Sequence, residues 1–117
     1  MTVRRLKTYT GSQGYVYQYY FVGKRPAAGV SEATEYVFDV TSDRKTTYEV
    51  SVILSRTAVA AWADAHGRPL ADSEQYAAVK IRLFRAFDEV EDMQLDGRWL
   101  QVDLQSLEES LASLGVE

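Results

Sequence analysis

The spacing of apolar residues changes near residue 55, and this change constrains the fold more than any other feature. Across residues 46–54 apolar and polar residues alternate, as in a β-strand with one buried face. The predicted inward residues are Tyr48, Val50, Val52 and Leu54. From Ala58 onward, apolar residues recur every three or four positions, as in an amphipathic helix. The sequence therefore predicts a chain that is mainly β over residues 1–55 and mainly α over residues 56–117.

Three more strands are predicted before residue 46, at residues 3–10, 15–23 and 35–41. Gly11 and Gly14 lie between the first two, which is typical of a hairpin loop. A longer connection with Pro26 and Gly29 follows the second strand, and a compact turn at residues 42–45 follows the third. We expect these strands to form an antiparallel meander.

Two helices are predicted after the strands. The first is capped by Ser55 or Thr57 and ends at Gly67, and its Trp62 is expected to anchor it to the sheet. The second begins at Asp72 or Ser73 and runs to about Asp92. Its apolar stripe comprises Tyr76, Val79, Leu83, Phe87 and Val90, and we expect this stripe to lie on the sheet.

The C-terminal segment is less regular. Residues 98–103 fit a short strand, and Ser106 and Glu109 have the spacing of a capping box that would begin a third helix. At 117 residues, of which 46% are hydrophobic, the chain suits one core. The sequence thus predicts a single α+β domain over residues 1–117: a four-stranded antiparallel sheet with two to three helices on one face.

The composition excludes several classes of protein. The chain has no cysteine, which excludes a disulfide framework and cysteine-ligated metal centres. No apolar run approaches the ~20 residues that span a bilayer. The first residues also lack the apolar segment of a secretory signal. We therefore expect a cytoplasmic protein without a membrane partner.

No catalytic residues, metal ligands or cofactor site are predicted, and the chain is not expected to be an enzyme. The single histidine, His66, precedes the helix-ending Gly67, where a cation stabilises the helix terminus. Capping therefore explains His66 without catalysis. The acidic residues between Asp88 and Asp96 lack the alternating ligand pattern of a calcium loop. We interpret them as a solvated helix face.

Five of the eight tyrosines lie between residues 9 and 20, and three of them share one face of the second strand. Tyr15, Tyr17 and Tyr19 point to one side of the strand, because successive side chains alternate. The other side carries Val16, Tyr20 and Val22. A sheet in a small domain buries one face, so one set remains for a partner. We expect the first set to face a partner and the second set to face the core.

Two functions follow from this surface. The first is a non-catalytic interaction protein that forms a homodimer through the tyrosine-rich sheet surface, since two-fold dimers are the commonest oligomers. The alternative is a module that binds a ligand or single-stranded nucleic acid, with bases on the tyrosines and phosphates on basic loops. The basic residues are Lys24, Arg25, Arg44 and Lys45.

The charge distribution bears on the second function. Residues 1–56 carry eight Lys/Arg and five Asp/Glu, whereas residues 57–117 carry five and twelve, so the balances are +3 and −7. The basic half would suit an anionic partner. A different surface composition of sheet and helices is the simpler explanation, and a pI near 5.0 argues against nucleic acid.

Overall fold

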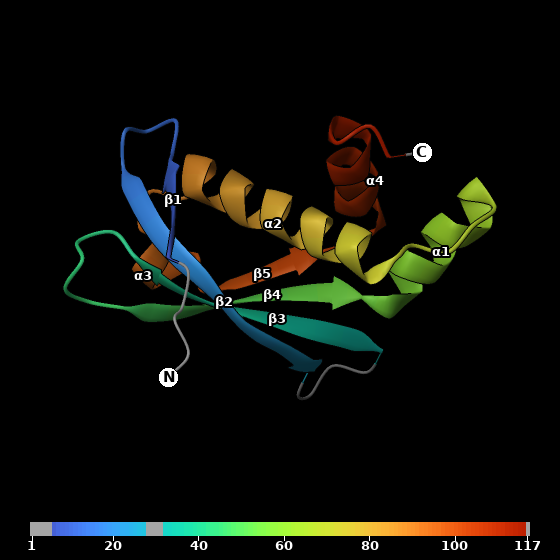
Figure 1. The fold of residues 1–117 in the computed structure, drawn as a ribbon, viewed down its shortest axis with the longest axis horizontal. Coiled ribbons are helices and arrows are strands. Elements are labelled where there is room, and N and C mark those ends of the chain that lie inside the picture. Colours follow the sequence, from blue (N-terminus) through green and yellow to red (C-terminus); the bar gives the residue numbers. More distant parts are fainter. Residues whose placement is uncertain (1–5, 28–31, 117) are drawn as a thin grey trace.

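The computed structural model describes residues 6–27 and 32–116 as an α+β fold, in which a curled five-stranded sheet packs against helices (Figure 1). The strands are β1 (Lys7–Thr10), β2 (Val16–Pro26), β3 (Ala33–Thr41), β4 (Tyr48–Ser55) and β5 (Trp99–Val102). The helices are α1 (Arg56–His66), α2 (Asp72–Glu89), α3 (Met93–Asp96) and α4 (Leu104–Ser113). The predicted residues 3–5 of the first strand lie outside the described residues.

The sheet confirms the predicted meander and corrects its extent. Strands β1 to β4 pair in sequence order and are antiparallel. The prediction of a four-stranded, purely antiparallel sheet was wrong, because β5 pairs with β4 in parallel. A parallel neighbour requires a long crossover connection, which the helices between β4 and β5 provide. The short strand expected at residues 98–103 is this fifth strand.

Helix α1 has the predicted ends. The Ser55 hydroxyl accepts a hydrogen bond from the Ala58 N–H at 3.2 Å, so Ser55 is the N-cap. Gly67 ends the helix with φ of 74°, a left-handed conformation that glycine adopts without steric cost. Trp62 is fully buried in the core, as predicted for the residue that anchors this helix.

The two later helices differ from prediction at their ends. Helix α2 ends at Glu89 rather than near Asp92, because Val90 is extended and Asp92 instead caps α3. The Asp92 carboxylate accepts from the Leu95 N–H at 3.1 Å. The predicted capping box at Ser106 was wrong. Asp103 is the N-cap of α4, and its carboxylate accepts from the Ser106 N–H at 2.8 Å.

The core lies between the sheet and α2, with α1 and α4 completing the cover. The expected inward residues of β3 and β4 are buried together with the α2 stripe, which confirms how α2 is oriented. The fully enclosed side chains include Phe38, Val50, Val79, Leu83 and Phe87. This arrangement leaves the other face of the sheet without a helix among the described elements.

Candidate functional site

The tyrosine face of β2 points into the core, so the predicted interface was wrong. Tyr17 and Tyr19 are only 2% and 4% exposed, whereas Val16 and Val22 on the other side are about half exposed, at 45% and 50%. Tyr15, which precedes β2, remains exposed. Of the three predicted contact tyrosines, only Tyr15 is available to a partner.

Tyr17 and Tyr19 are buried because they pack against phenylalanine side chains of α2. The Tyr17 ring stacks on Phe87 with centroids 4.2 Å apart and an interplanar angle of 7°. Tyr19 meets Phe84 edge to face at 5.7 Å. Pairs of this geometry are stabilising beyond the area that they bury. The phenylalanines of α2 therefore fix which face of β2 is inside.

The four predicted cations do not form one site. Lys24 pairs in register with Tyr36 near the start of β3, whereas Arg44 and Lys45 lie in the turn after the end of β3. That turn has a local structural explanation. The Asp43 carboxylate accepts from the N–H groups of Thr46 and Lys45, both at 2.8 Å, and these bonds lower the pKa of Asp43. The length of β3 thus separates the two basic pairs.

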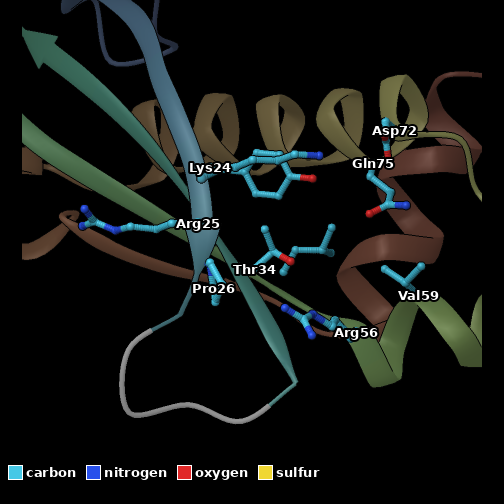
Figure 2. A pocket seen from close by; sticks show the side chains of 10 residues that line it. Lys24, Arg25, Pro26, Thr34, Arg56, Val59, Asp72 and Gln75 are labelled. Atoms are coloured by element: carbon cyan, nitrogen blue, oxygen red, sulfur yellow. The ribbon is translucent and has the colours of Figure 1, made fainter.

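Lys24 and Arg25 are consecutive residues of β2, so their side chains point to opposite faces of the strand. The β-bulge between Phe21 and Gly23 precedes both of them. Beyond the bulge Lys24 lies beside Tyr36 on the helix-covered side, and Arg25 lies on the other side beside Glu35. Figure 2 shows the two side chains leaving β2 in opposite directions. The charged groups of Lys24 and Arg25 therefore lie on opposite faces of β2.

On the uncovered face, Arg25 is used by a buried carboxylate. Its guanidinium donates to Glu35 at 3.0 and 3.3 Å, and the Ser51 hydroxyl donates to Glu35 at 2.5 Å. Glu35 is only 4% exposed, and these two donors, Arg25 first, lower its pKa. A hollow of about 400 Å³ lies over this cluster and also contacts Trp99, which is about half exposed. The cluster is a satisfied structural network.

On the helix side, the sheet, α1 and the start of α2 enclose a pocket of about 450 Å³. We call it the α2 pocket. Its lining residues are Lys24, Arg25, Pro26, Thr34, Tyr36, Leu54, Arg56, Val59, Asp72 and Gln75. In Figure 2 Lys24 points across the pocket toward Asp72 and Gln75, and Arg56 lies on the opposite side of the pocket from Asp72. A volume of this size is within the range of small-molecule sites.

Three cations of the described residues line the α2 pocket, and Arg25 is the one that is paired with a carboxylate, that of Glu35. Among the described residues neither Lys24 nor Arg56 forms a side-chain ion pair, although six other cationic–acidic pairs occur, such as Arg68 with Glu74. The Lys24 ammonium lies 5.8 Å from the centroid of the Tyr36 ring, a cation–π contact. The pocket thus offers two positive charges beside an aromatic ring.

The other polar groups of the pocket are an acid, an amide and a phenol. Asp72 occupies the first turn of α2, where the helix dipole stabilises a negative charge. Burial, and then the charge of Asp72, raise the pKa of Tyr36, so its hydroxyl stays protonated at neutral pH. Gln75 lies one turn along α2. These groups suit a ligand that carries hydrogen-bonding groups as well as an anion.

The sequence could not identify most of this pocket. Lys24 and Arg25 were predicted as binding residues, but the tertiary structure alone brings Thr34, Arg56 and Gln75 to them from β3, α1 and α2. Arg56 has no local signal, because it directly follows a helix cap in an ordinary first turn.

Neither a metal-binding cluster nor a membrane-spanning helix is found among the described residues. In residues 6–27 and 32–116, no group of three or more His, Asp or Glu side chains could hold a metal ion. No helix in the same residues combines the length and apolarity needed to cross a membrane. Comparison with protein-family models, curated proteins and solved structures finds no match. The α2 pocket and the uncovered sheet face are therefore the two candidate binding surfaces among the described residues.

Proposed function

We propose that this protein is a non-catalytic binding module that takes a small organic anion in the α2 pocket. The observation that carries the proposal is the pair Lys24 and Arg56, which flank the pocket without a carboxylate partner among the described residues. Cations that are not neutralised by the protein attract an anion more strongly than cations in ion pairs.

The rest of the lining sets the class of ligand. Pro26, Tyr36, Leu54 and Val59 provide apolar surface for a planar group. Asp72 and Gln75 can accept hydrogen bonds from a hydroxyl or amine on the same ligand. The best fit is therefore a small molecule that has one anionic group, a planar apolar part and a hydrogen-bond donor.

Ligand-observed NMR with three matched probes tests the proposal. Phenyl phosphate, benzyl alcohol and benzylamine share the ring and differ in charge. We expect phenyl phosphate to bind with a Kd of about 1 mM, as is typical of fragments, and the other two to bind more weakly. Arg56→Gln and Lys24→Gln should weaken phenyl phosphate binding, whereas Lys45→Gln, the same change in a distant turn, should not. Equal binding of all three probes would refute the proposal.

Self-association is a second candidate, and the uncovered sheet face favours it. Val16, Val22 and Trp99 are each about half exposed on that face. Exposed apolar side chains on a surface that no described helix covers are suited to an interface. This homodimer would use the face opposite to Tyr17 and Tyr19. Sedimentation should then show a concentration-dependent dimer that Val22→Thr combined with Trp99→Gln converts to a monomer. A wild-type monomer at high concentration would eliminate it.

A further inference from the structure

A row of cations and aromatic rings continues from the α2 pocket along α2 toward β1. The Phe21 ring lies 5.0 Å from the Tyr76 ring, centroid to centroid. The Lys80 ammonium lies 5.7 Å from the centroids of both Tyr76 and Phe84. The row therefore has positive charges at both ends and aromatic rings between them. We call it the α2 track, and its members are Lys24, Phe21, Tyr76, Lys80 and Lys7.

The track is accessible at Phe21, and the described part of β1 covers only part of β2. Strand β1 pairs with β2 from Val16 to Tyr19, and the described part of β1 begins at Lys7, opposite Tyr19. Beyond that point Phe21 is 38% exposed although its ring contacts the core residue Phe38. The bulge and Pro26 make this edge unsuitable for a further strand, since both interrupt regular pairing. A ligand that is bound by side chains therefore suits this edge better than an added β-strand.

The far end of the track carries a second pair of cations. Lys7 lies opposite Tyr19, and both Tyr19 and Lys80 contact the Phe84 ring, so the two lysines are neighbours on the track. Burial, and then repulsion by the positive charge of Lys7, lower the pKa of Lys80. Neither lysine forms an ion pair with an acid among the described residues. An anion between them would relieve this repulsion. The track therefore has unneutralised cations at both ends and aromatic rings between them.

We propose that the α2 track binds a short single-stranded nucleic acid, with phosphates at Lys24 and Arg56 and at Lys80 and Lys7, and a base against Phe21 and Tyr76. Single-strand platforms combine cations that follow the backbone with rings on which bases stack. Lys7 lies opposite Tyr19, so the separation of Tyr19 and Lys24 along β2 measures the distance between the two cation pairs. Five residues of strand span about 16 Å, which is too far for the phosphates of one nucleotide to reach both pairs. This inference rests on the proposed function, because the α2 pocket forms one end of the track.

The net charge of −4 does not prevent such binding. Charges more than about 8 Å apart are largely screened at physiological salt. The acids of α3 and α4 belong to elements other than those that form the track. Helix α2 itself carries four acids: Asp72 lines the pocket, Glu74 pairs with Arg68, and Asp88 and Glu89 lie at the C-terminal end. Affinity should therefore depend on the local cations and decrease with salt.

Fluorescence anisotropy of a labelled eight-nucleotide oligothymidylate at 50 mM salt tests the inference. We expect saturable binding whose affinity falls with salt. Lys80→Gln and Lys7→Gln should each weaken it and reduce the slope of log affinity against log salt by about 1. Lys45→Gln and Arg44→Gln remove the same charge far from the track and should leave both quantities unchanged.

Three outcomes would overturn the inference. The first is no binding at 50 mM salt, and the second is an equal loss in the track variants and the turn variants. The third is thymidine monophosphate binding as tightly as the oligonucleotide, which would indicate a mononucleotide ligand. Phenyl phosphate separates this inference from the proposed function. If phenyl phosphate binds and the oligonucleotide does not, only the track is wrong; if neither binds, both are wrong.

Discussion

The two ends of α2 lie against the same sheet and differ in how they are closed. At the C-terminal end, Asp88 holds the β1–β2 hairpin: its carboxylate accepts from the Tyr9 hydroxyl at 2.9 Å and from the Ser12 N–H at 2.9 Å. Gly11 approaches so closely that a Cβ there would lie 2.8 Å from the Phe87 carbonyl oxygen. At the N-terminal end the described part of β1 does not extend over the helix, and the α2 pocket is open (Figures 1 and 2).

The C-terminal end of α2 thus supports the β1–β2 hairpin, and we propose the N-terminal end as the binding end. Where β1 is present, Asp88 of α2 accepts hydrogen bonds from the β1–β2 hairpin through its carboxylate and its backbone carbonyl. At the other end of α2, Lys24 and Arg56 remain unneutralised among the described residues. We therefore expect substitutions at the closed end to reduce stability and substitutions at the open end to reduce binding.

The largest expected effect is at Phe87, which is fully buried and stacks on Tyr17. Phe87→Ala should lower the free energy of unfolding by about 3–5 kcal/mol, measured by denaturant titration, because it leaves a cavity in the core. Phe21→Ala is the matched control at the open end, where the ring is partly exposed. A cost for Phe21→Ala equal to that of Phe87→Ala would contradict the proposed division.

A smaller effect is expected at Asp88. Asp88→Ala removes the acceptor of Tyr9 and Ser12 and should cost about 1–2 kcal/mol, the usual range for part-buried hydrogen bonds to a charged group. Glu89→Ala is the control, since the Glu89 side chain makes only an exposed contact of 3.8 Å with Arg85. If both variants melt like the wild type, Asp88 does not hold the hairpin.

The smallest effect on stability is expected in the α2 pocket. Arg56→Gln should change the free energy of unfolding by less than about 0.5 kcal/mol, because the side chain has no ion-pair partner among the described residues to lose. The same variant should weaken anion binding. A clear loss of stability would show that Arg56 has a structural role instead.

The sequence predicted the strands and helices whose apolar residues recur at a regular spacing. It did not predict features that depend on contact with a segment far along the chain. The alternation in β4 and the stripe on α2 identified the core. The predicted orientation of β2 was wrong because both faces of this strand are aromatic. Contacts with the distant Phe84 and Phe87 determine which face is buried. The parallel pairing of β5 and the convergence of Arg56 with Lys24 likewise have no local signal.

We propose that α2 is open to an anion at its N-terminal end and is closed by the hairpin at its C-terminal end. Backbone amide chemical shifts, recorded by NMR during a titration with phenyl phosphate, test this claim most directly. The account predicts saturable shifts at Thr34, Arg56 and Gln75, and none at Ser12 or Asp88. Shifts that are concentrated at the hairpin, or that spread evenly over the chain, would contradict it.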